Sequence, residues 1–181
     1  MLQDMTLSEF LVHLLREVGT GHVFGVPGGA LMPLHSAIEA SPHLEFVCSR
    51  HECAAAYMAD AYARVSGGLG VCAVTTGPGA TNAITGLANA RFDYSPLLLI
   101  SAQVATAHIG KHAFQECSQM THSITEASAP FALESLEIVD ARTAPTQIRG
   151  LVERALRTPQ GPVHLSVPFD LLGETVESSA A

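Results

Sequence analysis

Glu52 is the side chain of this sequence that is best placed to do chemistry. It follows Arg50-His51 and stands where an alanine-rich run begins, and that run favours a helix from Glu52 to about Val65. A carboxylate in the first turn of a helix interacts favourably with the helix dipole, which is a structural role. A partly buried carboxylate can also exchange a proton with a nitrogen atom of a ligand, which is a catalytic role.

Two glycine-rich turns lie before and after Glu52, and each follows a predicted strand. Pro27-Gly28-Gly29 comes after a short apolar run, and Gly77-Pro78-Gly79 comes after a run of valine and alanine. Glycine lets a backbone approach a ligand closely, and proline suits the first position of a helix. Ligands of parallel sheets bind beyond the carboxyl ends of the strands. We therefore expect both turns and Glu52 to meet at one edge of a sheet.

The elements that must position these residues alternate between strands and helices along the chain. This alternation predicts an α/β fold, with a doubly wound, mainly parallel six-stranded sheet and helices on both faces. The expected strands cover residues 22–26, 45–49, 70–75, 97–101, 131–133 and 162–167. The expected helices cover residues 6–18, 31–40, 52–65, 78–91, 119–125 and 143–157.

Four motifs follow one another along the chain: F-G-x-P-G-G at 24–29, R-H-E-x-x-A-A at 50–56, T-x-G-P-G-x-x-N at 75–82 and F-Q-E at 114–116. Together they resemble the pyrimidine-binding domain of thiamine diphosphate (ThDP) enzymes, and among these enzymes the acetolactate synthase-like group. Each motif is weak alone, but four in order are specific. The resemblance covers about residues 6–172. We expect a ThDP pyrimidine-binding domain over 1–172 and a flexible C-terminal tail over 173–181.

The resemblance also implies roles for individual residues. The glutamate that matches Glu52 binds a ring nitrogen of the aminopyrimidine and promotes activation of the cofactor, and Gln115 would face the thiazolium and the substrate. Glu52 and Gln115 are thus the implied catalytic residues. The implied cofactor-binding residues are Pro27, Gly28, Glu52, Thr75, Pro78 and Asn82. For any single turn residue, ordinary turn chemistry explains the sequence equally well.

The chain lacks a signature that ThDP enzymes need. Their pyrophosphate domain holds the diphosphate and a divalent cation through a Gly-Asp-Gly motif, and no such sequence occurs here. The resemblance therefore implies that ThDP and Mg²⁺ are shared with a pyrophosphate-binding partner subunit that carries the motif and holds the metal. We expect no metal ligands in this chain, no activity without the partner, and a homodimer or an α₂β₂ assembly. The sequence leaves open whether the chain is a split subunit or part of a longer enzyme.

Three functions are compatible with these observations. The first is decarboxylation of a small 2-oxo acid followed by carboligation, as in the acetolactate synthase-like group. The second is a non-ligating 2-oxo acid decarboxylase of the sulfopyruvate or phosphonopyruvate type. The third is a non-catalytic regulatory or interaction module of the same fold. The retained Glu52 favours an enzyme, because such a module has no need of it.

The composition of the chain limits the kinds of partner that we expect. The net charge is −8, with 9 Lys and Arg against 17 Asp and Glu, which argues against nucleic acid and anionic membranes as partners. The N-terminus has no basic region, and we expect a cytoplasmic protein. The four cysteines form no CxxC pair and are expected to be buried free thiols. His108 and His112 have the spacing of a metal pair, but no third ligand accompanies them.

Overall fold

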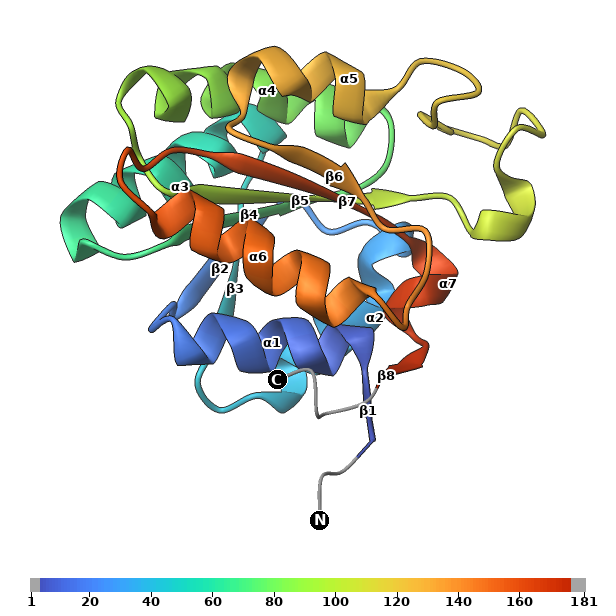
Figure 1. The fold of residues 1–181 in the computed structure, drawn as a ribbon, viewed down its shortest axis with the longest axis horizontal. Coiled ribbons are helices and arrows are strands. Elements are labelled where there is room, and N and C mark those ends of the chain that lie inside the picture. The colour runs from blue at the N-terminus through green and yellow to red at the C-terminus, as the bar shows by residue number, and fades with distance from the viewer. Residues whose placement is uncertain (1–3, 177–181) are drawn as a thin grey trace.

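The computed structural model describes residues 4–176, and its centre is a six-stranded parallel sheet (Figure 1). The strand order is β3-β2-β4-β5-β7-β6, and every neighbouring pair is parallel. This confirms the predicted fold class. The strands are β2 (His22–Gly25), β3 (Glu45–Cys48), β4 (Gly70–Val74), β5 (Leu97–Gln103), β6 (Ser135–Glu137) and β7 (Val163–Pro168).

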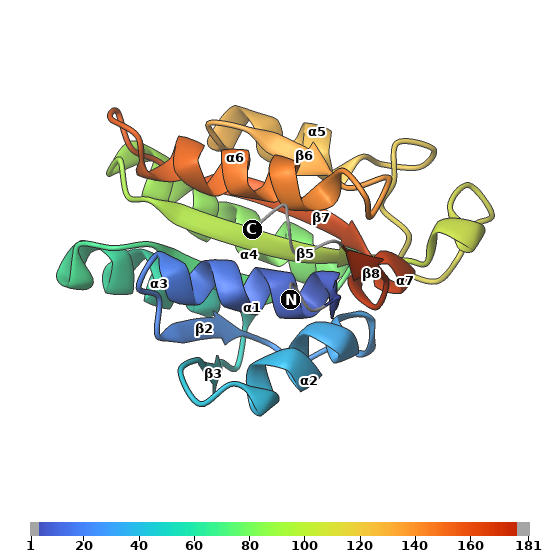
Figure 2. The same ribbon diagram turned by 60° about the horizontal axis from the view of Figure 1, so that its bottom comes forward.

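Helices cover both faces of this sheet (Figures 1 and 2). One face carries α1 (Leu7–Glu17), α2 (Met32–Ala40) and α6 (Ala144–Leu156), and the other carries α3 (Glu52–Ser66), α4 (Pro78–Phe92) and the short α5 (Ile124–Ser128). The alternation of side chains along a strand builds both cores. In β4, Val71 and Ala73 join the core beneath α1 and α6, whereas Cys72 and Val74 join the core beneath α3 and α4.

The helices α3 and α4 lie against each other through small residues. A Cβ atom added at Gly86 would lie 2.4 Å from the Cβ of Ala56, so the two backbones are too close for any side chain there. A polar contact joins the C-terminal halves of the same helices. Asp60 is fully buried, and its Oδ2 accepts hydrogen bonds from Arg64 at 3.1 Å and from Asn89 at 2.8 Å.

Two predicted elements are wrong in position. The helix expected over 119–125 begins only at Ile124, because the Ser123 hydroxyl accepts a hydrogen bond from the Glu126 amide and caps α5 there. The strand expected over 131–133 is instead β6, and the preceding Ala129–Phe131 forms a turn of 3₁₀ helix. The pairing of β6 with β7 starts at Ser135 opposite His164.

The two ends of the described chain form a small sheet of their own. The strand β1 (Met5–Thr6) pairs antiparallel with β8 (Thr175–Val176), after the short helix α7 (Phe169–Leu172). Val176 is buried against the core. The predicted tail therefore does not begin at Gly173, since the packed structure continues to Val176; residues 177–181 lie outside the described residues.

Within residues 4–176, no helix has both the length and the apolar character needed to cross a membrane. All four cysteines are free thiols, but only Cys72 and Cys117 are buried. The prediction of four buried thiols is wrong for Cys48, which is exposed, and for Cys53, which is half-buried. Both precede or open α3 near the sheet edge, where solvent reaches them.

Candidate active site

The site begins with Glu52, the first residue of α3. The preceding His51 is the N-cap, and its Nδ1 accepts a hydrogen bond from the Cys53 amide at 3.1 Å. This cap uses one of the amide groups that a helix start leaves unpaired. Glu52 is half-buried and lies just beyond the carboxyl end of β3, as predicted.

Asn82 holds the Glu52 carboxylate. The Asn82 Nδ2 donates a hydrogen bond to Glu52 Oε2 at 3.0 Å, across 30 residues of sequence. Pro78 occupies the first turn of α4, so Asn82 lies one turn into that helix and faces the start of α3. Within residues 4–176, no other hydrogen bond to this carboxylate is present, which leaves Oε1 available to a ligand.

The two glycine turns both pack against Thr75, beside Glu52. A Cβ atom added at Gly28 would lie 2.5 Å from the Thr75 Cβ, and one added at Gly79 would lie 2.8 Å from the Thr75 Cγ2. The Cβ atom added at Gly79 would also lie 3.6 Å from Glu52 Oε1. Thr75 therefore lies between both turns, and only glycine permits this approach. We call Gly28, Glu52, Thr75, Gly79 and Asn82 the Glu52 cluster.

Pro27 and Pro78 border this cluster without a recorded contact to Glu52. Pro27 is exposed on the loop after β2, next to Gly28, and Pro78 is exposed at the start of α4, next to Gly79. Both rings fix the backbone beside a glycine that takes part in the close packing. All six predicted cofactor-binding residues thus belong to, or directly adjoin, the arrangement around Glu52.

Gln115 lies beside the second glycine turn. Its carbonyl oxygen accepts a hydrogen bond from Thr76 Oγ1 at 3.0 Å, and its backbone has a positive φ of 63°. A Cβ atom added at Gly77 would lie 2.6 Å from the same carbonyl oxygen. The backbone of the loop that carries Gln115 is therefore fixed against the turn that starts α4. No hydrogen bond of the Gln115 side-chain amide is present among residues 4–176.

A buried polar group anchors this loop, and sequence reasoning missed it. Gln103, at the end of β5, is fully buried, and its Oε1 accepts hydrogen bonds from Thr76 Oγ1 at 3.3 Å and from the Cys117 amide at 3.4 Å. The Gly77 amide donates to the Cys117 sulfur at 3.2 Å. A glutamine at the end of an apolar strand, before a loop with its own motif, is the signal that could have identified it.

Glu116, the last residue of the F-Q-E motif, shapes the loop itself. Its carboxylate accepts hydrogen bonds from Ser118 Oγ at 2.6 Å and from the amides of Gly110 at 2.6 Å and Ala113 at 3.3 Å. These hydrogen bonds lower the pKa of Glu116, and the bond from Ser118 has the largest effect. The Glu116 carboxylate is therefore charged and bonded within the loop, so its role is structural.

The family described as "Thiamine pyrophosphate enzyme, N-terminal TPP binding domain" matches residues 5–122, which include the whole Glu52 cluster. The chain belongs to this family. The predicted resemblance to the pyrimidine-binding domain is thereby confirmed.

In sequence, this thiamine pyrophosphate enzyme domain is similar to acetolactate synthases. It is 40% identical over 171 residues to the acetolactate synthase isozyme 3 large subunit of Escherichia coli K12, covering 94% of this chain and 29% of that protein. It is 42% identical over 172 residues to the mitochondrial acetolactate synthase of Schizosaccharomyces pombe, covering 95% of this chain and 25% of that protein. The chain thus spans less than a third of the length of these relatives.

A solved structure agrees with the fold of this domain. The thiamine diphosphate-dependent 4-hydroxybenzoylformate decarboxylase of Rhodococcus jostii RHA1 superposes with a TM-score of 0.89 and 28% sequence identity. The match covers 97% of this chain and 32% of that protein. The shared fold extends over nearly all of the domain and over one third of the neighbour.

The remaining candidates from the sequence lie away from the Glu52 cluster or do not react. Phe114 is 87% exposed, so it is not an anchor of the domain's own core. Burial, followed by the nearby charges of Glu52 and Cys53, raises the pKa of the Cys72 thiol, which keeps it protonated. Among the described residues, no group of three His, Cys, Asp or Glu could hold a metal ion, so nothing here supports the spacing of His108 and His112 as a metal site.

Proposed function

We propose that this domain binds the aminopyrimidine ring of thiamine diphosphate and supplies Glu52 as the residue that activates the cofactor. The observation that carries this proposal is the Glu52 cluster. One carboxylate oxygen is held by Asn82, the other is available, and two glycine turns pack closely beside it. The residues present fit a flat heteroaromatic ring with ring nitrogens, because they offer a carboxyl oxygen that can share a proton with a ring nitrogen, beside glycines that leave room for the ring.

Each residue has a defined part in this proposal. Glu52 holds a proton at its available oxygen and shares it with a ring nitrogen, and Asn82 fixes the direction of the carboxylate. Gly28 and Thr75 line the ring from the side of β2 and β4, with Pro27 and Pro78 bordering it. Gln115 is the residue placed toward the substrate, because its backbone is fixed by Thr76 while its amide is unengaged. When bound, thiamine diphosphate supplies the carbon nucleophile that 2-oxo acid chemistry requires.

We further propose that the diphosphate and Mg²⁺ are held by a pyrophosphate-binding part, on a partner subunit or elsewhere in a longer chain. The chain spans less than a third of its relatives, and its sequence has no Gly-Asp-Gly. The exposed sides of α3 and α4 carry large apolar side chains, of which Val65 is 90% and Phe92 85% exposed. Such surfaces mark association sites. A homodimer or an α₂β₂ assembly would cover this face.

The proposed reaction is decarboxylation of a small 2-oxo acid with carboligation, in line with the acetolactate synthase relatives. Release of the product without ligation is the second candidate, and it is favoured by the name of the solved neighbour, a decarboxylase. A cytoplasmic location, the choice of substrate and the need for a partner remain predictions. A regulatory module of this fold would give the same structure but would not need Glu52.

The decisive experiment compares Glu52→Gln with Glu126→Gln in the complete assembly, purified from its own cells with its partner. Both residues lie in the first turn of a helix on the same face of the sheet, but Glu126 lies outside the Glu52 cluster. Glu52→Gln should assemble, melt at the same temperature and lose roughly 100-fold or more in ThDP-dependent turnover of 2-oxo acids. Glu126→Gln should retain activity. Full turnover in Glu52→Gln would refute the role of Glu52.

A further inference from the structure

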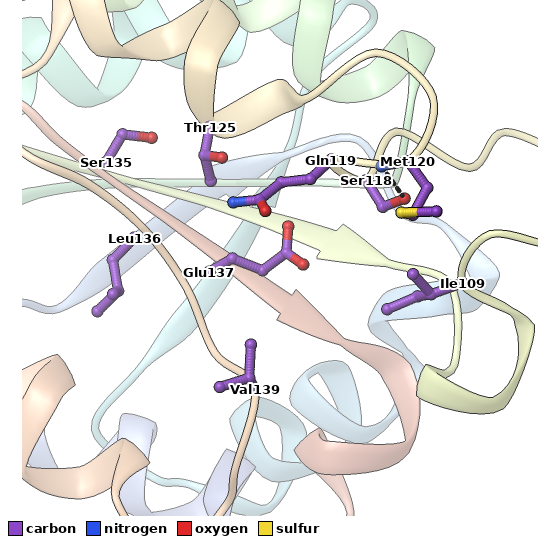
Figure 3. Close-up of a pocket in the computed structure, with 9 residues that line it drawn as sticks. All are labelled: Ile109, Ser118, Gln119, Met120, Thr125, Ser135, Leu136, Glu137 and Val139. Carbon is purple, nitrogen blue, oxygen red and sulfur yellow. Dashed lines mark hydrogen bonds between the residues drawn. The ribbon is translucent and has the colours of Figure 1, made fainter.

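A cavity that contains none of the Glu52 cluster lies between β6 and the loop of residues 104–123. Its volume is about 470 Å³, within the range of small-molecule sites. Ile109 and Met120 border it from the loop, and Val139 borders it from the segment after β6 (Figure 3). Glu137 enters it from β6, with its carboxylate pointing toward the side of Gln119.

Glu137 belongs to a polar row on this face of the sheet. It lies opposite Ser166 in the parallel pairing of β6 and β7, just as Ser135 lies opposite His164. Paired residues of neighbouring strands point to the same face, and the 2.8 Å hydrogen bond between Ser135 and His164 shows this directly. Ser166 is fully buried. The core of this sheet face is therefore polar where it meets the cavity.

Two atoms of this row are buried without a hydrogen-bond partner among the described residues. They are Glu137 Oε2 and Ser166 Oγ. Buried polar atoms in native proteins are nearly always paired, so each unpaired atom calls for an explanation. A ligand in the cavity would bond the carboxylate at the oxygen that is not buried, and rotation about the soft terminal torsion of the glutamate decides which oxygen that is.

The hydroxyl groups that line the cavity are already engaged. Ser118 Oγ donates to Glu116 at 2.6 Å, Ser135 Oγ is bonded to His164, and Thr125 Oγ1 is bonded to Ser123 Oγ at 2.9 Å. Among the described polar side chains that line the cavity, only the Glu137 carboxylate and the Gln119 amide have no hydrogen bond, and the carboxylate is the stronger acceptor.

Charge selects the kind of ligand. Glu137 is the one charged residue among those that line the cavity, and no lysine or arginine accompanies it. Partial burial raises the pKa of its carboxyl, and a cation bound beside it would favour the charged form again. The net charge of the chain, −8, acts in the same direction. These conditions disfavour phosphate and carboxylate groups and favour a cation.

We propose that this cavity binds an alkylammonium or alkylguanidinium group, with the cation on Glu137 and the alkyl chain against Ile109, Met120 and Val139. Two sources share this chemistry. One is a free small amine, and the other is a lysine or arginine side chain of the partner that the domain meets. The proposal does not depend on the function proposed for Glu52.

The test uses the full 181-residue chain and n-butylammonium chloride as the probe. Methyl NMR signals of Ile109, Met120 and Val139 are followed during titration. We expect saturable binding with a Kd of about 1–10 mM, as befits a ligand of five heavy atoms. n-Butanol and butyrate of the same length should bind at least tenfold more weakly. Absence of saturation, or equal binding of n-butanol, would overturn the proposal.

Matched variants separate the carboxylate from the rest of the cavity. Glu137→Gln should weaken n-butylammonium binding at least tenfold, whereas Glu134→Gln, an exposed acid three residues earlier, should leave it unchanged. Should Glu137→Gln fail to fold, Met120→Lys provides a second test. Met120 is 74% exposed, so its replacement is tolerated, and the new ammonium should occupy the cavity and suppress binding of the probe. Unaltered binding in the variant that is tested contradicts the proposal.

The assembled enzyme distinguishes the two sources. If a partner side chain occupies the cavity, n-butylammonium should bind the chain alone but not the complex, and Glu137→Gln should weaken the complex. If the ligand is a free amine, binding should persist in the complex with a similar Kd. Failure of both arms, with no binding to either form, would reject the cavity as a cation site while leaving the role of Glu52 unaffected.

Discussion

Asn82 Nδ2 donates a hydrogen bond to Glu52 Oε2 at 3.0 Å and thereby joins the start of α4 to the start of α3. The bond restrains a carboxylate that has no other hydrogen bond among residues 4–176. A restrained carboxylate presents one defined oxygen to a ligand, which lowers the cost of ordering it on binding. Asn82 itself is exposed, so its side chain matters little for the stability of the domain.

Asn82→Ala should therefore lower kcat in the assembled enzyme by about 10- to 100-fold, the equivalent of one hydrogen bond to a charged group. The melting temperature should stay within about 2 °C of the parent. Gln147→Ala, which removes an exposed amide from α6 on the other face of the sheet, serves as the control and should have no effect. Asn82→Asp should be worse than Asn82→Ala, because it sets a second negative charge beside Glu52.

The contact of Gly86 with Ala56 leads to a prediction about stability. Gly86→Ala places a Cβ atom 2.4 Å from the Ala56 Cβ and should destabilise the domain by about 1–3 kcal/mol, since α3 and α4 must move apart. Gly150→Ala is the matched control, because Gly150 also lies within a helix but has no atom within 4 Å of the added Cβ. It should stabilise the domain by up to about 1 kcal/mol through helix propensity. Urea unfolding measures both, and equal effects would contradict the packing described.

His164 should make the domain sensitive to acid. It is fully buried between Ser101 and Ser135, and desolvation lowers its pKa to about 3. The unfolded chain binds a proton on this histidine near pH 6.5, whereas the folded chain does not. The contribution of His164 to the free energy of unfolding is therefore fully present above pH 6.5. It is lost as the pH falls toward 3, by at most about 1.4 kcal/mol per pH unit.

The measurement is the free energy of unfolding between pH 4.5 and 7, for the parent and for His164→Gln. The raised pKa of Glu137 acts in the opposite direction, because protonation of that carboxyl on acidification favours the folded state. The difference between parent and variant isolates His164, and it should shrink as the pH falls. A difference independent of pH would show that His164 binds a proton equally well in the folded and the unfolded chain, and would contradict the lowered pKa.

Asp60 offers a further prediction about the α3–α4 contact. The carboxylate is fully buried and binds Arg64 and Asn89, so Asp60→Ala should leave both without this partner and cost about 2–4 kcal/mol. Asp93 also binds Arg64, at 3.4 Å, but it is exposed. Asp93→Ala should therefore cost less than about 1 kcal/mol. Thermal unfolding of the two variants compares them, and similar losses would contradict the difference in burial.

Much of the fold follows from local patterns in the sequence. The buried strands β4 and β5 are runs of apolar residues, and helices such as α1 begin at a capping box, here Thr6 with Glu9. Both signals depend only on residues that are close together in the sequence. The prediction of a strand over 131–133 is wrong, because β6 is only three residues long and is held by its pairing with β7. No local pattern in the sequence reveals this pairing.

The candidate site was predictable only in part for the same reason. Glu52, Gly28, Thr75 and Asn82 come from motifs whose order fixes them at one sheet edge, and the structure brings them together. The side chain of Gln103 and the cavity at Glu137 depend on contacts between distant segments. Neither residue stands in a motif, so only the folded chain shows what each of them faces.

The pairing of Met5–Thr6 with Thr175–Val176 has a consequence for how such a domain can be rearranged. The strands β1 and β8 lie side by side near one end of α1, on the side of that helix away from α3 and α4 (Figure 1). A short peptide could join them, and new ends could be opened at an exposed turn such as Ser66–Gly67 without cutting the sheet. The domain is thus suited to circular permutation, and to insertion into another polypeptide as a closed module.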